Sequence, residues 1–170
     1  MKIKNLLDTD FINYKVPAML IETPICSFKC DKECGRQVCQ NSRLAAAPTL
    51  VCDNQKIINY YYENPLTEAI IFCGLEPFDS FTDVLDFLLE LKDYCQNNSC
   101  RLPKIVIYTG YYPEEICGYL EMLKTLDFSF IIKFGRFVPD RPHKFDEVLG
   151  VELSSDNQFA IELENLNLNR

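Results

Sequence analysis

Residues 69–77 read AIIFCGLEP, a short apolar run followed directly by a glycine, a carboxylate and a proline. The run Ala69–Cys73 has the length and the branched side chains expected of a strand that is buried on both faces. Three other runs share these properties: Ala18–Ile21, Ile105–Tyr108 and Phe128–Phe134. Because parallel sheets are covered on both faces, these runs predict parallel strands.

Segments with helical spacing lie between these runs. From Ser80 to Tyr94, apolar residues recur at steps of three or four, as on the buried side of a helix. A second helix is predicted from Pro113 to Leu126, and a third from Asn54 to Asn64, although the tyrosines at 60–62 lower its helix propensity. Residues 160–170 have only a weak helical pattern, and we expect this tail to fray. The alternation of strands and helices predicts an α/β fold.

Size and charge exclude several classes of protein. A chain of 170 residues with 48% hydrophobic content can bury one sizeable core, so we expect a single domain over residues 1–170. The net charge of -8 and the pI near 4.7 argue against a nucleic-acid partner, because such binding needs clustered Lys and Arg. The amino end lacks the apolar stretch of a secretory signal, and no segment has the roughly 18 apolar residues that span a bilayer. We therefore expect a cytoplasmic protein without a membrane partner.

Cysteines are numerous and unevenly placed. The chain has nine, and four of them fall within 14 residues: Cys26, Cys30, Cys34 and Cys39. In a reducing compartment such a group indicates metal binding rather than disulfides, and soft thiolates select iron-sulfur clusters or zinc. Zinc sites usually gather two close cysteine pairs separated by a longer insert, which is not the spacing found here. The spacing favours an iron-sulfur cluster and leaves zinc or reduced thiols as alternatives.

Residues 24–45 read PICSFKCDKECGRQVCQNSRLA and resemble the cluster loop of radical S-adenosylmethionine enzymes. In that superfamily three cysteines bind three irons of a 4Fe-4S cluster, and the fourth iron stays open. The resemblance implies Cys26 and Cys30 as metal ligands. The third ligand is either Cys34, with one extra residue before it, or Cys39, after a longer insert.

The tetrapeptide CQNS at 39–42 favours Cys39 as the third ligand. It looks like the Cys-Tyr-Asn-x-Ser that follows the third cysteine in activases of anaerobic ribonucleotide reductase. Residues 31–38 would then form an insert, and Val38 would lie against the adenine of S-adenosylmethionine. Cys34 would be either an unliganded thiol or a fourth ligand that closes the cluster, which would make the protein an electron carrier.

The tetrapeptide GLEP at 74–77 looks like the Gly-Gly-Glu-Pro motif of the same superfamily, with Leu75 in place of the second glycine. The match implies Gly74, Glu76 and Pro77 as residues that bind S-adenosylmethionine. A glycine lets the backbone approach a ligand closely, and a carboxylate accepts charge-assisted hydrogen bonds from an ammonium group. We expect Glu76 to bind the methionine ammonium.

Three later segments extend the resemblance, which spans roughly residues 10–158. The segment IYTGY at 107–111 resembles a strand and loop of the reductase activases. The segments KFGRF at 133–137 and SSDNQ at 154–158 look like their closing stretches, with a lysine and a serine where the family often has Asp and Gly. These segments imply further cofactor-binding residues: Thr109, Gly110, Lys133, Ser155 and Asn157.

For five further residues, a purely structural interpretation stands beside a functional one. Tyr108 is either a core aromatic or a ligand contact, and Arg136 is either a solvated charge or the partner of a carboxylate. His143, the single histidine, lies in a polar loop and is expected at the surface without a function. Cys95 and Cys100 could cross-link under oxidation, but a loop position and a reducing compartment favour two free thiols.

The resemblance implies a fold and an activity. The fold would be a partial (β/α) barrel of about five or six parallel strands with outer helices. The protein would be an oxygen-sensitive oxidoreductase of anaerobic metabolism, which takes an electron from flavodoxin or ferredoxin and cleaves S-adenosylmethionine to a 5'-deoxyadenosyl radical. In an activase this radical takes a hydrogen atom from a glycine of a glycyl-radical enzyme partner, and no catalytic residue beyond the cluster is implied. The alternatives are a radical enzyme with another peptide or small-molecule substrate, and a non-catalytic iron-sulfur or zinc module.

Overall fold

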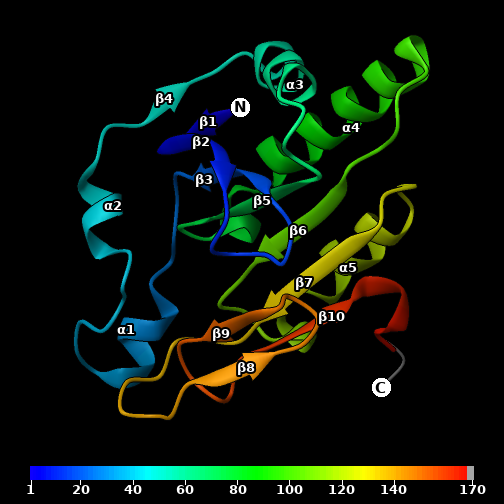
Figure 1. Cartoon of the computed structure of the whole chain (residues 1–170). Helices are drawn as coiled ribbons and strands as arrows, with labels where there is room; N and C mark the ends of the chain where they lie inside the picture. Colours follow the sequence, from blue (N-terminus) through cyan, green and yellow to red (C-terminus); the bar gives the residue numbers. More distant parts are fainter. Residues whose placement is uncertain (168–170) are drawn as a thin grey trace.

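The computed structural model describes residues 1–167, and its centre is a mixed sheet of six strands within that range (Figure 1). The strand order across the sheet is β10-β7-β6-β5-β3-β2. In chain order the strands are β2 Asn5–Asp10, β3 Ala18–Thr23, β5 Ala69–Gly74, β6 Lys104–Tyr108, β7 Phe130–Phe134 and β10 Phe159–Glu162. Strands β3, β5, β6 and β7 pair in parallel. The first three contain their predicted runs, and β7 begins at Phe130, two residues after the start of the fourth run.

The sheet is not parallel throughout, which corrects the expectation of five or six parallel strands. Within residues 1–167, the two outer strands of this sheet, β2 and β10, pair antiparallel with β3 and β7. The loop 11–17 between β2 and β3 is too short for a crossover, which usually needs a dozen or more residues. The chain reaches β10 through a small antiparallel hairpin rather than a helix, with β8 at Lys144–Asp146 and β9 at Val151–Leu153.

The three predicted helices are present. They are α3 Asn54–Glu63, α4 Phe81–Asn98 and α5 Cys117–Lys124. The segment predicted as one helix from Pro113 begins with a 3-10 turn, η2 Pro113–Glu115, and α5 starts after Ile116, whose φ of -133° interrupts the helix. Asp53 caps α3 by accepting a hydrogen bond from the Gln55 N–H at 2.9 Å.

Short elements complete the chain. A two-stranded antiparallel sheet pairs β1, Lys2–Ile3, with β4, Leu50–Val51. The remaining short helices and turns are α1 Lys29–Cys34, α2 Ser42–Ala46, η1 Pro77–Ser80 and η3 Leu163–Asn165. The predicted tail thus contributes β10 and η3, and its last residues, 168–170, lie outside the described part of the chain. No helix within residues 1–167 is long and apolar enough to cross a membrane.

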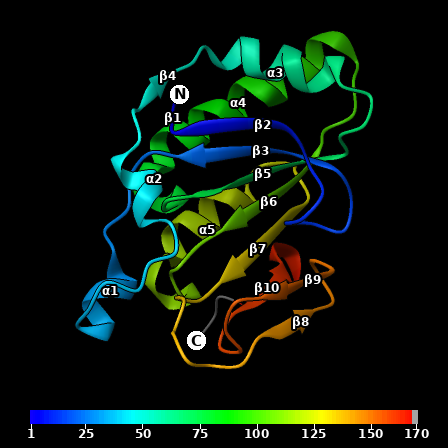
Figure 2. The same ribbon diagram turned by 60° about the vertical axis from the view of Figure 1, so that its left-hand side comes forward.

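The parallel strands separate two apolar layers. On one face, alternate strand residues such as Phe72 pack against α3, α4 and α5, which Figure 2 shows together on one side of the sheet. On the other face, residues such as Ile71 pack against Tyr14 of the 11–17 loop and against Leu149 and Leu153 around the β8–β9 hairpin. Helices α3, α4 and α5 therefore cover one face, and the 11–17 loop and the β8–β9 hairpin lie against the other.

Replacing Phe87 by alanine is expected to lower the free energy of unfolding by about 3–5 kcal/mol, because a large buried ring leaves a cavity. The side chain is 0% exposed on α4, and its ring centroid lies 5.7 Å from that of Phe72. Leu89→Ala on the same helix is the control, since Leu89 is 44% exposed and its loss should cost less than about 0.5 kcal/mol. Urea denaturation measures both. Equal losses in the two variants would contradict this packing.

Candidate metal centre

The carboxyl ends of the four parallel strands meet at one edge of the sheet and surround a cavity of about 380 Å³. The cysteine-rich loop follows β3, the GLEP turn follows β5, Thr109 and Gly110 follow β6, and Gly135 and Arg136 follow β7. In parallel α/β sheets this edge is where ligands bind, because rigid strands bring several loops together there. The fold thus gathers the motifs from four separate parts of the sequence.

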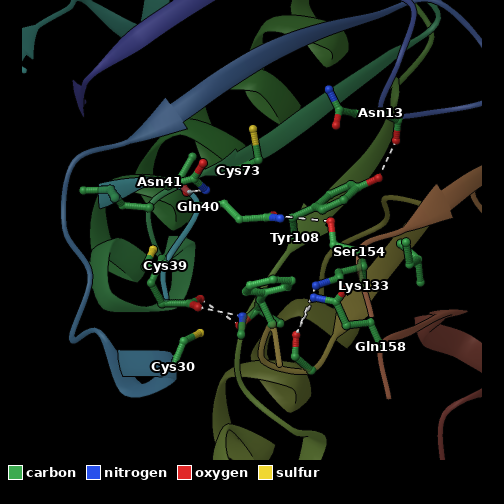
Figure 3. Close-up of a pocket in the computed structure, with 18 of the residues that line it drawn as sticks. Asn13, Cys30, Cys39, Gln40, Asn41, Cys73, Tyr108, Lys133, Ser154 and Gln158 are labelled. Atoms are coloured by element: carbon green, nitrogen blue, oxygen red, sulfur yellow. Dashed lines mark hydrogen bonds between the residues drawn. The ribbon is translucent and has the colours of Figure 1, made fainter. Parts of the chain in front are cut away.

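Three of the four clustered cysteines line this cavity. They are Cys26, Cys30 and Cys39, whereas Cys34 is not part of the wall. Figure 3 shows the Cys30 and Cys39 side chains at the same end of the cavity. A β-carbon at Gly110 would lie 3.8 Å from Cys30 Sγ, so this thiol adjoins the loop after β6. Burial raises the pKa of Cys26 to about 12 and also raises the pKa of Cys30.

The segment between Cys30 and Cys39 closes on itself. It begins as the short helix α1, which ends at Gly35 in a left-handed conformation with φ 64°. Asp31 Oδ1 then accepts hydrogen bonds from the backbone N–H groups of Val38 at 2.7 Å and Cys39 at 2.8 Å. These bonds bring the chain back after the insert, so that Cys39 returns to the cavity while Cys34 stays outside its wall.

The GLEP turn and η1 hold the cysteine loop through three hydrogen bonds. The Glu76 N–H donates to the Ile25 carbonyl at 2.7 Å, and the Asp79 carboxylate accepts from the Ser27 N–H at 2.6 Å. The Asn41 side chain donates to the Gly74 carbonyl. Gly74 has φ 81°, and a β-carbon there would lie 2.7 Å from Glu22 Cβ, so only glycine fits.

Glu76 is a buried carboxylate that lines the cavity. Its side chain accepts hydrogen bonds from the Thr109 hydroxyl at 2.7 Å, the Gly110 N–H at 2.9 Å and the Phe78 N–H at 3.1 Å. Burial raises the pKa of Glu76 to about 7, and the three hydrogen bonds act in the opposite direction by favouring the charged form. The carboxylate is thus held rigidly in a place where a bound cation would stabilise its charge.

Lys133 is a second buried charged residue that lines the cavity. Its ammonium donates to the Gly135 carbonyl at 3.1 Å and lies 6.0 Å from the centre of the Tyr108 ring. Burial lowers its pKa to about 8, while the charge of Glu76 acts in the opposite direction. Gln158 donates to the same carbonyl at 3.2 Å, as Figure 3 shows. The ammonium has donors left for a ligand in the cavity.

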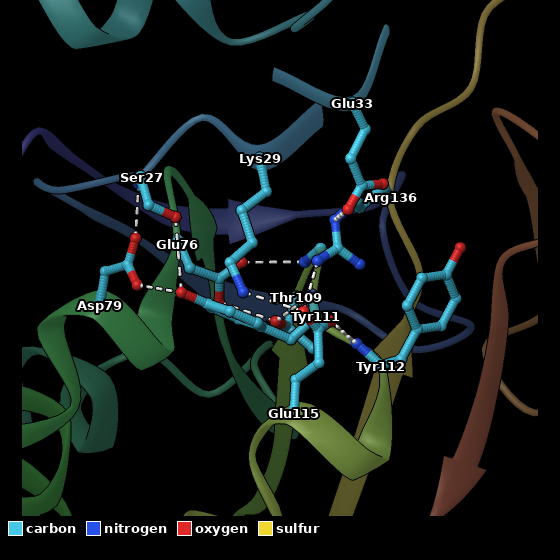
Figure 4. A network of polar contacts seen from close by, with 11 residues as sticks. Ser27, Lys29, Glu33, Glu76, Asp79, Thr109, Tyr111, Tyr112, Glu115 and Arg136 are labelled. Carbon is cyan, nitrogen blue, oxygen red and sulfur yellow. Dashed lines mark hydrogen bonds and ion pairs between the residues drawn. The ribbon is translucent and has the colours of Figure 1, made fainter. Parts of the chain in front are cut away.

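Arg136 connects the insert to η2. Its side chain is 4% exposed, and Nη2 donates to Glu115 Oε1 at 2.5 Å. Its Nε lies 2.9 Å from Glu33 Oε1 without the angle of a hydrogen bond, and the guanidinium packs on the Tyr112 ring (Figure 4). Burial acts to raise the pKa of Glu115, but hydrogen bonds from Arg136 and Lys29 outweigh it and lower the pKa to about 2. Arg136 is therefore a buried ion-pair partner, not a solvated charge.

The structure brings most of the predicted site residues to the cavity and leaves several outside its wall. Gly74, Glu76, Thr109, Gly110 and Lys133 line it. Those outside the wall are Val38, Pro77, Ser155 and Asn157. Their polar groups serve the fold: the Val38 N–H binds Asp31, the Ser155 N–H binds Gln158, and Asn157 Nδ2 donates to the Arg136 carbonyl. Their predicted contacts with a cofactor stay predictions.

Several polar residues of the cavity were not singled out from the sequence. They are Asn13, Gln40, Asn41, Ser154 and Gln158. Four of these positions lie inside the CQNS and SSDNQ segments, and those two motifs were the signal in the sequence that could have identified them. Tyr108 also lines the cavity, and its hydroxyl donates to the Asn13 carbonyl at 2.6 Å. His143 lies at the surface, 3.6 Å from Glu152.

The donor set of this cavity fits a soft metal centre. Cys26, Cys30 and Cys39 line the same cavity, and thiols are the ligand type that iron-sulfur clusters require. Within residues 1–167, no three Cys, His, Asp or Glu side chains stand close enough together to form a finished metal site. The path of the chain thus brings the three cysteines to the same cavity, but their side chains do not converge on one point.

The fold and these residues define an α/β protein with a thiol-lined metal centre at the carboxyl ends of its strands. A family model described as a 4Fe-4S single cluster domain matches residues 20–159, and the chain belongs to that family. It is therefore a protein that binds a 4Fe-4S cluster. Comparisons with curated proteins and with solved structures find no match.

Replacing Asp31 by alanine should release the Val38–Cys39 backbone and lower the iron bound per chain after anaerobic reconstitution. Asp31→Asn keeps an acceptor oxygen at the same place and should retain most of the iron. Asp86→Ala, at an exposed site on α4, is the control. Iron and acid-labile sulfide per chain measure the effect. Full iron in Asp31→Ala would show that the return of the chain to Cys39 does not depend on this carboxylate.

Proposed function

We propose that the protein is a radical S-adenosylmethionine enzyme whose cluster is held by Cys26, Cys30 and Cys39. The observation that carries the proposal is that these three cysteines share a cavity with Glu76, whereas Cys34 lies outside its wall. Three ligands would leave the fourth iron open. Supplied with one electron, the cluster would cleave S-adenosylmethionine to methionine and a 5'-deoxyadenosyl radical.

The cavity offers complementary groups for S-adenosylmethionine. Within residues 1–167, Glu76 Oε2 accepts a hydrogen bond only from the Gly110 N–H, which leaves a lone pair for the methionine ammonium. Lys133, with its remaining donors, would meet the methionine carboxylate. The amides of Gln40 and Asn41 and the hydroxyl of Ser154 give the wall polar groups for a ribose. In this proposal the chain binds and orients the ligand, and its burial of these charges excludes water.

The finer proposal is an activase. The parallel strands and their helices on one face would form the partial barrel of the superfamily, with its loop-covered face as the inside. A glycyl-radical enzyme, such as an anaerobic ribonucleotide reductase, would present a glycine loop to the cavity. Flavodoxin or ferredoxin in the cytoplasm would supply the electron, in anaerobic conditions. The motifs CQNS, GLEP, IYTGY and SSDNQ, in this order, support it.

Alanine at Cys26, Cys30 or Cys39 should each abolish 5'-deoxyadenosine formation and lower the bound iron, because each removes a ligand of the cluster. Cys34→Ala is the matched control and should keep both. The assay uses the anaerobically reconstituted chain with dithionite and S-adenosylmethionine, and the product is measured by chromatography. No product from a fully loaded wild-type cluster would exclude the enzyme and favour the non-catalytic module. Loss of iron in Cys34→Ala would make Cys34 a ligand.

Glu76→Gln should retain the cluster but weaken binding of S-adenosylmethionine by roughly 10- to 150-fold, since a charge-assisted hydrogen bond contributes about 1.5–3 kcal/mol. Equilibrium dialysis of the reconstituted protein measures this affinity. Glu121→Gln, at an exposed position on α5, controls for the loss of one charge. Unchanged affinity in Glu76→Gln would rule out its contact with the ammonium.

The activase is tested separately by mixing the reconstituted protein with a purified anaerobic ribonucleotide reductase and recording its electron paramagnetic resonance spectrum. A glycyl radical in the reductase is the expected result. S-adenosylmethionine cleavage without this radical would favour the alternative, a radical enzyme with another peptide or a small molecule as substrate.

A further inference from the structure

A second pair of cysteines lies at the other end of the parallel strands from the metal centre. Cys95 is in the last turn of α4, and Cys100 follows the helix end, shortly before β6 begins at Lys104. Figures 1 and 2 both show this end of α4 well away from α1 and the cluster loop. Its chemistry is therefore independent of the centre described above.

The backbone at the end of α4 brings the two cysteines together. Ser99 has a left-handed conformation with φ 52°, and the Cys100 N–H donates to the Cys95 carbonyl at 3.1 Å. A hydrogen bond over this span, around a left-handed residue, is the mark of a Schellman helix end. In that motif the side chains at the two bonded positions are frequently in contact.

Tyr62 of α3 binds this pair. Its hydroxyl donates to the Arg101 carbonyl at 2.9 Å and lies 2.8 Å from Cys95 Sγ. The 2.8 Å separation makes the hydroxyl and the Cys95 thiol hydrogen-bond partners, and either atom can be the donor. The ring is stacked on Tyr94 with centroids 5.2 Å apart, which fixes its position. The reduced form of Cys95 is thus stabilised by a hydrogen-bond partner that the fold holds in place.

The two thiols differ in access. Cys95 is 4% exposed, and burial raises its pKa to about 11. Cys100 lines a cavity of about 500 Å³ at the amino ends of β5 and β6, together with Tyr62 and Arg101. A small molecule that enters this cavity therefore meets Cys100 first.

We propose that Cys95 and Cys100 form a reversible dithiol site that exchanges with the disulfide of a small thiol. The Cys100 thiolate attacks one sulfur of the incoming disulfide, which forms a mixed disulfide and releases one thiol. Cys95 then loses its proton to water and attacks Cys100 Sγ, which releases the second thiol and leaves a Cys95–Cys100 disulfide. The chain's two thiols are oxidised, and the incoming disulfide is reduced to two thiols.

The test uses the full chain with its cluster, equilibrated without oxygen in mixtures of reduced and oxidised glutathione. Free thiols are blocked by alkylation, and peptides are mapped by mass spectrometry. We expect a Cys95–Cys100 disulfide that reverts when reduced glutathione is in excess. Cys117, whose thiol donates to the Pro113 carbonyl, is the control for a single thiol and should form only a mixed disulfide. The proposal is overturned if both thiols stay reduced, or if each carries glutathione without the internal disulfide.

Tyr62→Phe supplies a second measurement. Loss of the hydroxyl removes a hydrogen bond from the reduced pair, so the equilibrium should move toward the disulfide by roughly 3- to 10-fold. Tyr60→Phe, at an exposed position on the same helix, should leave it unchanged. A disulfide equilibrium that is the same in the folded and urea-denatured chain, or in Tyr62→Phe and wild type, would show that the fold does not build this site.

Discussion

The parallel pairing of β3 with β5 is the constraint on which the rest of the site depends. Its register ends with Thr23 beside Gly74, so the cysteine loop and the GLEP turn leave the sheet from adjacent positions. The Thr23 hydroxyl donates to the Cys73 carbonyl at 3.1 Å, and Glu76 N–H and Asp79 then bind the loop at Ile25 and Ser27. A shift of one residue in this register would move every one of these contacts to the wrong face.

Charged groups at this edge of the sheet are unusually well buried. Glu76 is 5% exposed, Lys133 7% and Arg136 3%. Burial of an ion costs free energy unless hydrogen bonds or an opposite charge compensate it, and each of these groups has such partners. Within residues 1–167, the hydrogen-bond donors to Glu76 are neutral groups, and burial raises its pKa to about 7. The charged form of Glu76 therefore gains most from a cationic ligand. The site is therefore arranged for binding rather than for stability.

Much of this arrangement was predictable from local sequence. The four apolar runs and the periodicity of Ser80–Tyr94 identify the parallel strands and α4, because burial on both faces or on one side leaves a clear pattern. The antiparallel strands β2 and β10 leave none, since NLLDTD and FAIE are half exposed and pair only through the finished sheet. The exclusion of Cys34 from the cavity wall depends on the Asp31 hydrogen bonds, and the burial of Arg136 depends on Glu33 and Glu115. These are contacts of single polar side chains, which leave no periodic pattern in the sequence, so they could not be predicted from it.

Because Asp31 closes the insert at its base, the length of the insert is not coupled to the distance between the cysteine side chains on either side of it. The number of residues between Cys30 and Cys39 does not set the distance between their side chains, because the loop is joined at its base by the Asp31 carboxylate. Lys32, Gly35, Arg36 and Gln37 are exposed at its tip. Residues at the tip can therefore differ in number and kind without moving Cys30 or Cys39, and the exposed tip offers a surface for recognition beside the metal centre.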